Sequence, residues 1–217
     1  METLKLKEIL GELPYYTKQN LNLYLNKNDE ALNYWIKTLI RREALIPMKK
    51  GMYISSFYME KVKSKNEMEE YLEYLVNIMR YPSYISLEYA LSKYGLIPES
   101  VFQITAITTK TTRKYDSKII TFSYRKIKDV LFSGFTEQKY GDWNIRFATA
   151  PKALFDYLYL KKFVSNSELE NYLLERGRIN WQILKLKDKK LFREYIRISS
   201  TKKMNTILKI LEKNKLA

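Results

Sequence analysis

Apolar and polar residues recur at helical spacing between residues 28 and 42. One side of a helical wheel drawn at about 100° per residue is apolar and comprises Leu32, Trp35, Ile36, Leu39 and Ile40. The opposite side is polar and comprises Asn33, Tyr34, Lys37, Thr38 and Arg41. The pattern predicts a helix with one core face, capped by Asn28, with Arg42 at the negative end of its dipole.

The polar face of this helix allows two interpretations. Its side chains suit base edges and phosphates in a DNA major groove, but any small domain also presents a polar helix face to water. The next residues, ALIPMKKGMYIS, favour DNA. They predict two short strands joined at Lys49, Lys50 and Gly51, which resemble the wing of a winged helix-turn-helix.

Two further helices are predicted before this one. The first covers about residues 3–13 and ends at Pro14, and Thr17 caps a second, short helix whose inward residues are Leu21, Tyr24 and Leu25. Helix, short helix, longer helix and hairpin is the order of a winged helix-turn-helix, predicted here for residues 1–58. One amphipathic helix is expected over residues 57–80, with 59–80 as a linker.

The remaining residues, 81–217, predict a larger mixed α/β domain with a helical tail, so the fold class is α+β. Ser83 or Ser86 caps a helix that ends at Gly95. Strands are expected at 101–109 and 119–127 with a turn at 110–118, then a turn at TEQKYGD and a strand at 143–150. A helix from Pro151 and a basic helical tail from about residue 164, capped by Ser165 or Ser167, complete the chain.

Composition narrows the function classes. The chain has no cysteine and no histidine, which removes disulfides, thiolate zinc sites and Ser-His-Asp triads. No glycine-rich phosphate loop, signal peptide or membrane-length apolar run is present, so we expect a cytoplasmic protein without a cofactor and without membrane contact.

The formal net charge of +15 indicates an anionic partner, nucleic acid before membrane. Residues 1–60 contain nine basic and seven acidic residues, so most of the excess positive charge lies outside the expected DNA-binding domain. The densest basic stretch provides candidate phosphate contacts at Lys110, Arg113, Lys114, Lys118, Arg125, Lys126 and Lys128. A solvated hairpin with charged edges is the alternative. A second basic cluster follows residue 184 and comprises Lys185, Lys187, Lys189, Lys190, Arg193, Arg197, Lys202 and Lys203.

An enzymatic alternative is a Mg²⁺-dependent nuclease. Asp116 and Glu137 on adjacent strands would hold the metal ion, and Lys139 would lie near the attacked phosphate. Both carboxylates fall in predicted turns, which weakens this hypothesis. A third alternative is an RNA-binding module, because a basic domain with many tyrosines can stack unpaired bases.

Several stretches together resemble the AbiEi-type antitoxins of bacterial AbiE toxin–antitoxin systems, which act in abortive infection, a form of phage defence. The quoted stretches are YYTKQNLNLYLNKNDEALNYWIKTLIRREALIPMKKGMYI, PSYISLEYALSKYGLIPES, TFSYRKIKDVLFSGF and ATAPKALFDYLYL. They cover most of residues 15–160. The family's usual Pro-Glu-Lys-Ala-Leu is here Ala150-Pro151-Lys152-Ala153-Leu154, so the glutamate is missing.

The resemblance implies a non-enzymatic DNA-binding transcriptional repressor. Its winged helix would recognise inverted repeats in the operator of its own operon, and its C-terminal domain would counteract a nucleotidyltransferase-like toxin without a stable complex. The expected DNA-binding residues are Asn33, Tyr34, Lys37, Thr38, Arg41, Arg42, Lys49 and Lys50.

Overall fold

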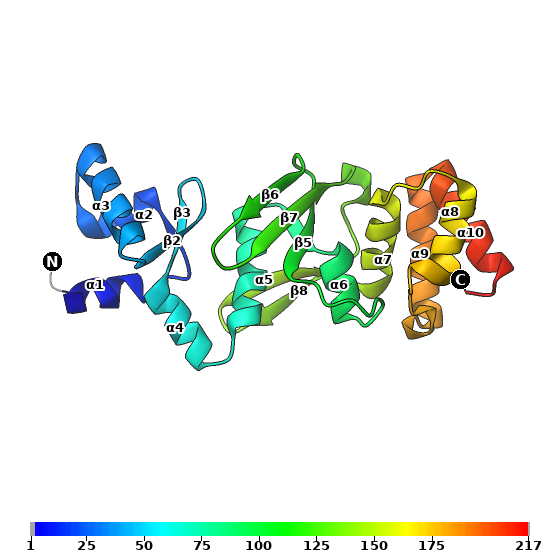
Figure 1. Ribbon diagram of the computed structural model, residues 1–217, viewed down its shortest axis with the longest axis horizontal. Helices are drawn as coiled ribbons and strands as arrows, with labels where there is room; N and C mark the ends of the chain where they lie inside the picture. The colour runs from blue at the N-terminus through cyan, green and yellow to red at the C-terminus, as the bar shows by residue number, and fades with distance from the viewer. Residues whose placement is uncertain (1–2, 217) are drawn as a thin grey trace. The chain divides into compact units, whose positions relative to one another are not determined.

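The computed structural model describes residues 3–216, of which residues 3–5 are described through their backbone only, and its fold is mixed α+β (Figure 1). The chain forms two compact units. The first consists of Met1–Leu75 and Tyr115–Thr121, and the second of Val76–Lys114 and Phe122–Ala217. Each unit has its own buried core.

Within the described residues, the first unit contains four helices and the start of a fifth around a small sheet. Its elements are α1 (Thr3–Leu10), β1 (Tyr16–Thr17), α2 (Lys18–Leu25), α3 (Asp29–Arg41), β2 (Leu45–Lys49), β3 (Met52–Ser55), α4 (Ser56–Ser64) and the start of α5 (Met68–Met79). The sheet has the order β1-β3-β2, and both pairs are antiparallel. The predicted hairpin is therefore confirmed, whereas the two-residue strand β1 was missed.

Capping side chains fix where α2 and α3 begin. The Asn20 backbone N–H donates to the Thr17 hydroxyl over 3.2 Å, and the Ala31 N–H donates to Asn28 Oδ1 over 2.9 Å, so both predicted caps are confirmed. On α2, Leu21 is buried as expected. Tyr24 is not, because its hydroxyl reaches outward to Glu12 Oε2 at 3.3 Å.

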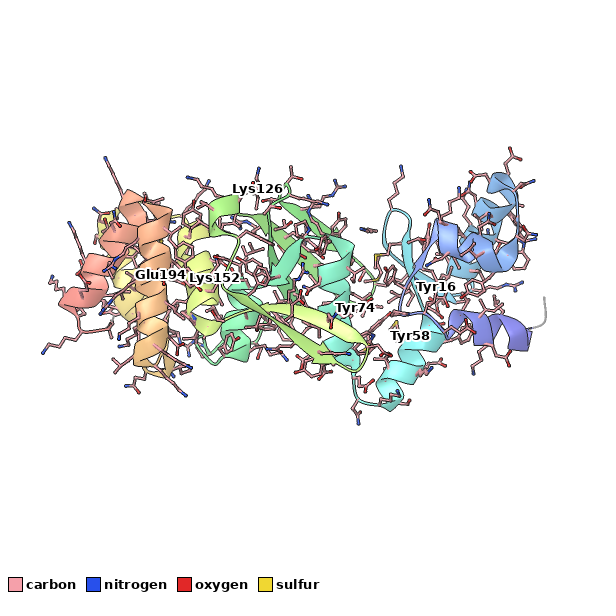
Figure 2. All side chains as sticks on the ribbon, turned by 180° about the vertical axis from the view of Figure 1, so that it is seen from behind. Tyr16, Tyr58, Tyr74, Lys126, Lys152 and Glu194 are labelled. Carbon is pink, nitrogen blue, oxygen red and sulfur yellow. The ribbon has the colours of Figure 1, made fainter. Side chains whose placement is uncertain are left out.

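Helix α1 ends at Leu10, three residues before the predicted end. Tyr16 is the cause, because its buried hydroxyl donates to the Ile9 carbonyl and accepts from the Leu13 N–H at 3.2 Å (Figure 2). These are the groups that a longer helix would join to each other. Burial raises the pKa of Tyr16 to about 12, so the phenol stays protonated and keeps donating at neutral pH.

The single helix predicted over residues 57–80 is wrong, because the chain turns between α4 and α5. Asn66 adopts the left-handed conformation with φ of 58°, and the Glu67 N–H bonds to the Val62 carbonyl at 3.2 Å. This is the helix-ending motif that glycine or asparagine favours after the last helical turn.

The second unit is built on a six-stranded sheet with the order β6-β7-β5-β4-β9-β8. The strands are β4 (Ser83–Ile85), β5 (Gln103–Thr108), β6 (Arg113–Asp116), β7 (Thr121–Lys126), β8 (Phe135–Tyr140) and β9 (Trp143–Ala148). The β4–β9 pair is parallel, and the β4–β5 and β8–β9 pairs are antiparallel. The helical elements are α6 (Leu87–Lys93), α7 (Ala150–Leu160), α8 (Asn166–Asn171), α9 (Leu186–Ser199) and α10 (Lys202–Lys213), with short turns η1 (Asp129–Leu131), η2 (Tyr172–Arg176) and η3 (Trp181–Ile183).

Two predicted turns are strands in the structure. The expected turn at 110–118 contains β6, and TEQKYGD contains most of β8. Both strands lie at the edges of the sheet, and their side chains are mostly exposed. An edge strand without a buried face needs no apolar alternation, which is why the pattern missed them.

The predictions for the helices of this unit are largely confirmed. Helix α7 has Pro151 in its first turn, Ser165 caps α8 by accepting from the Glu168 N–H at 3.1 Å, and the tail is helical. Ser83 lies in β4 instead of capping α6. No helix within residues 3–216 combines the length and apolar character needed to cross a lipid bilayer.

A fully buried ion pair lies in the core of this unit. Lys152 Nζ bonds to Asp156 Oδ1 one turn along α7, and both side chains have no exposed area (Figure 2). Asp156 Oδ2 accepts from the Ser86 hydroxyl at 2.8 Å and from the Tyr84 hydroxyl at 3.0 Å. Ser86 therefore stands at the start of α6 without capping it through its side chain. Burial lowers the pKa of Lys152 and raises that of Asp156.

Candidate nucleic-acid interface

The outward face of α3 carries the predicted reading residues. Asn33, Tyr34, Lys37 and Arg41 are exposed and Thr38 is partly exposed, while Leu32, Ile36 and Leu39 are buried beneath them. Tyr34 leaves 66% of its area open, which is high for an aromatic side chain. The structure thus brings the five predicted positions together on one surface.

Local hydrogen bonds hold two side chains of this face. The Thr38 hydroxyl donates to the Tyr34 carbonyl at 3.0 Å, and Asn33 Nδ2 donates to Asp29 Oδ2 at 3.4 Å. Lys37 and Arg41 form no ion pair with any residue in the described part of the chain. Their charges are therefore available to an external anion.

Charge changes sign along α3. Asp29 and Glu30 occupy the first turn, where they complement the positive end of the dipole, and Lys18 Nζ lies 2.6 Å from Asp29 Oδ1. The hydrogen bond from Lys18 lowers the pKa of Asp29. Lys37 and Arg41 lie in the second half of the helix, with Arg42 next as its exposed C-cap. A phosphate backbone would therefore be attracted to the C-terminal half of α3.

The β2–β3 hairpin presents two lysines at its tip. Lys50 is exposed and Lys49 is partly exposed with an interaction of its own. Gly51 adopts φ of 76°, and a Cβ there would touch nothing within 4 Å, so the glycine serves the turn and leaves the tip uncrowded. Met48 and Met52 are buried at the base of the tip, which anchors the hairpin on the core of the first unit.

A strained residue joins α3 to this hairpin. Glu43 has φ of 56°, in the left-handed region that glycine favours. Its N–H bonds to the Ile40 carbonyl at 3.0 Å, and the Ala44 N–H bonds to the Leu39 carbonyl at 2.9 Å, which together end the helix. Lys118, one of the predicted phosphate contacts, lies in the first unit with its Nζ 3.4 Å from Glu43 Oε1.

The remaining predicted phosphate contacts belong to the second unit. All six, Lys110, Arg113, Lys114, Arg125, Lys126 and Lys128, are exposed. They come from β6, β7 and the segments that flank them, and β6 and β7 are neighbours in the sheet. Arg113 and Lys114 have interactions within the chain, whereas Lys126 extends from the sheet (Figure 2). These six basic residues are therefore accessible to an external anion or to solvent.

One residue of the C-terminal basic cluster is structural. Lys203 Nζ donates to the carbonyls of Tyr159 and Lys161 at 2.6 and 2.8 Å, and burial lowers its pKa. The ammonium thus caps the last carbonyls of α7 and joins that helix to α10. The Lys203 ammonium of the second basic cluster is therefore bonded within the chain.

The predicted nuclease site is not formed. Asp116 lies on β6 and Glu137 on β8, the two opposite edges of the sheet, with four strands between them. Thr121 donates its hydroxyl to Asp116 Oδ1 at 2.7 Å, and Arg146 Nε lies 2.6 Å from Glu137 Oε1. Within residues 3–216, no group of three or more acidic side chains gathers where a metal ion could bind.

Comparison of the chain with models of protein families and with curated proteins gave no match. The candidate interface therefore rests on the geometry and charge of this chain. Sequence reasoning missed the edge strand β8, whose residues 136–140 are exposed. The only signal for it was the dipeptide Gly141-Asp142 ahead of a recognisable strand, which suits a tight hairpin turn.

Proposed function

We propose that the protein is a sequence-specific DNA-binding repressor and that its first unit is a winged helix-turn-helix. The observation that carries the proposal is the position of the reading face of α3 next to a hairpin with lysines at its tip. A polar helix face alone would also suit contact with water. The neighbouring hairpin adds lysines that can contact DNA phosphates while the helix contacts the bases.

The element order supports this assignment. The order α1, β1, α2, α3, β2, β3 matches a helix-turn-helix followed by a wing, with β1 adding a third strand to the small sheet. The connection from α2 to α3 is only Asn26 to Asn28, and Asn26 adopts the left-handed conformation that closes the turn. Such a short connection holds the two helices at a fixed angle.

In the proposed complex, α3 enters the major groove. Arg41 and Lys37 suit guanine O6 and N7, and Asn33 suits adenine N6 and N7 once it leaves its weak contact with Asp29. Arg42, Lys49 and Lys50 neutralise phosphates on either side of the groove. The acidic first turn of α3 keeps that end of the helix away from the backbone.

Substitution of the two unpaired cations of α3 tests the assignment. Lys37→Ala or Arg41→Ala should weaken binding to the operator by about 1–3 kcal/mol in a gel-shift titration at fixed salt. Lys61→Ala is the matched control, since it removes an exposed lysine from α4 in the same unit. If both α3 variants bind as tightly as this control, α3 is not the reading helix.

We propose that the second unit contributes most of the electrostatic attraction. The first unit contains thirteen basic and twelve acidic residues, a net +1, against +15 for the whole chain. Each phosphate contact adds about one unit to the logarithmic dependence of affinity on salt. Replacing Lys126 and Lys128 with alanine should therefore lower that slope by up to about two units without changing the preferred sequence.

An antitoxin role for the second unit rests on the resemblance to AbiEi-type antitoxins alone. Its test is co-expression with a nucleotidyltransferase-like protein encoded beside it. Restored growth supports the role, and growth arrest that the chain does not relieve contradicts it. The gel-shift titration tests the DNA-binding assignment separately, because it contains no toxin.

A further inference from the structure

The edge strand β8 leaves one side of its backbone open. It is the last strand of the sheet and pairs only with β9 in the described part of the chain. All of its side chains from Thr136 to Tyr140 are exposed. The side chains of β8 are exposed on both faces of the strand and therefore do not block a second strand from pairing with its open edge.

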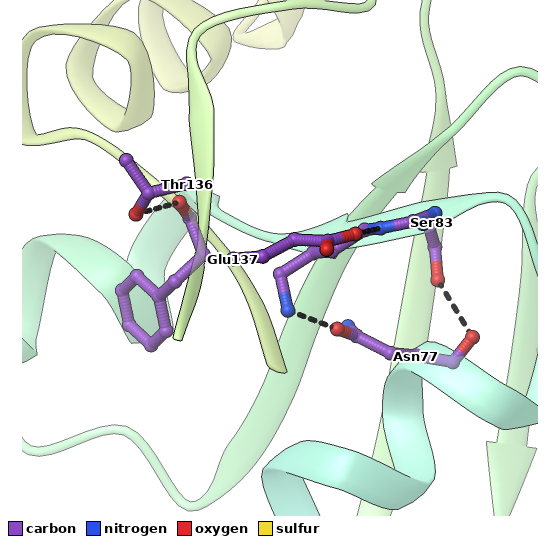
Figure 3. A network of polar contacts seen from close by, with 6 residues as sticks. Asn77, Ser83, Thr136 and Glu137 are labelled. Carbon is purple, nitrogen blue, oxygen red and sulfur yellow. Dashed lines mark hydrogen bonds and ion pairs between the residues drawn. The ribbon is translucent and has the colours of Figure 1, made fainter. Parts of the chain in front are cut away.

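The hydrogen bonds around Arg146 show which β8 groups point outward. In an antiparallel pair, two residues opposite each other either exchange both backbone hydrogen bonds or exchange neither. Glu137 lies opposite Arg146, and the Arg146 N–H donates to Asn77 Oδ1 instead (Figure 3). The N–H and C=O of Glu137 therefore point away from β9, and by the alternation of the strand those of Lys139 do so too.

The sequence of β8 is complementary to itself when reversed. Two copies placed antiparallel about Gln138 set Glu137 of each copy opposite Lys139 of the other, and Thr136 opposite Tyr140. Both Glu–Lys pairs are then the residues whose backbone groups point outward, so they can exchange hydrogen bonds as well as opposite charges. A shift of one residue in this register would bring the wrong backbone groups together.

Charge makes β8 a suitable place for two copies to meet. The net charge of +15 makes two copies repel each other overall, but β8 holds one acid and one base and is neutral. Charged residues on an edge strand usually oppose pairing with other strands. Here the same charges oppose unrelated strands and favour an identical one.

We propose that the protein forms a two-fold symmetric dimer by antiparallel pairing of β8 with β8 of a second copy. The contact is isologous, so it closes at two copies. The small area of a single strand pair makes the dimer weak and reversible. The inference concerns the free protein and does not depend on DNA binding.

Opposite charge reversals test the pairing with the full-length chain. In the paired register, Lys139→Glu sets acid against acid and Glu137→Lys sets base against base, so each variant alone should dimerise at least ~10-fold more weakly. An equimolar mixture of the two variants restores both opposite-charge pairs and should recover the dimer. Lys162→Glu, a reversal at an exposed lysine outside β8, is the control and should dimerise as the wild type does.

The readout is sedimentation velocity of protein at up to about 100 μM without DNA. A wild-type dimer, two weakened variants and a restored mixture support the proposal. It is overturned if the wild type is monomeric over this range, if Lys139→Glu leaves the dimer unchanged, or if the mixture stays monomeric. Because Glu137→Lys also removes the contact with Arg146, recovery in the mixture shows that this variant keeps its fold.

Discussion

The buried Lys152–Asp156 pair allows a quantitative prediction about the second unit. Lys152→Met keeps the length and apolar volume of the side chain but leaves the Asp156 carboxyl without the cation next to it. Breaking a buried ion pair from one side lowers the free energy of unfolding by about 3–5 kcal/mol, because a charge is left in a medium that solvates it poorly. Asp156→Asn should cost a similar amount by leaving the ammonium without a carboxylate.

The double variant separates this account from simple loss of packing. Lys152→Met with Asp156→Asn contains no buried charge, and the Asn carbonyl can still accept from Ser86 and Tyr84. The remaining cost is the unpaired amide, about 1–3 kcal/mol. Urea denaturation followed by circular dichroism measures all four proteins. Additive losses, equal to the sum of the two single variants within about 0.5 kcal/mol, would refute the reasoning.

The pH dependence has a defined sign. In the wild type, burial raises the pKa of Asp156 above its ordinary value of 3.8, and Lys152 opposes this rise. Lys152→Met removes the opposing charge, so the pKa of Asp156 should rise further and the folded variant should bind this proton more tightly than the folded wild type does. The contribution is fully present below about pH 4 and is lost as the pH rises through the raised folded pKa. The stability deficit of this variant relative to the wild type should therefore grow as the pH rises from about 4 through the raised pKa of Asp156, and a constant deficit would contradict a charge effect.

Two backbone positions give further predictions. Gly134 and Gly141 both have positive φ, of 76° and 54°, but only a Cβ on Gly134 would meet other atoms, 2.8 Å from Tyr195 Cζ and 3.0 Å from Lys152 Cδ. Gly141→Ala should lower the free energy of unfolding by about 1 kcal/mol from backbone conformation alone, and Gly134→Ala should lower it by about 2 kcal/mol more. Urea denaturation measures both losses, and equal losses would be inconsistent with this close packing. Glu43→Gly should be about 1 kcal/mol more stable than Glu43→Ala, since only glycine relieves the left-handed strain at φ of 56°, and the reverse order would show that the strain is absent.

Features encoded by neighbouring residues were predictable from the sequence. The sequence pattern predicted the two faces of α3 and the caps at Thr17 and Asn28. Each of these features depends on side chains within four residues of one another. The end of α1 was misplaced because it depends on Tyr16, which competes for the helical hydrogen bonds from outside the helix.

Features set by distant residues were not predictable from the pattern. Lys152 and Asp156 are visibly four residues apart, but their burial comes from Tyr84 on β4 and Tyr195 on α9. The edge strands β6 and β8 carry no apolar alternation because neither strand has a buried face. The proposed nuclease site failed because strand order decides whether Asp116 and Glu137 meet.

The central claim is that α3 reads duplex DNA. Fluorescence anisotropy at one fixed salt concentration can compare the whole chain on the duplex upstream of its own reading frame, on a shuffled duplex of equal length and composition, and on single-stranded RNA of that length. The proposed function predicts binding to the upstream duplex at least ~10²-fold tighter than to the shuffled duplex, and tighter than to the RNA. Equal affinity for the two duplexes, or a preference for the RNA, would contradict it.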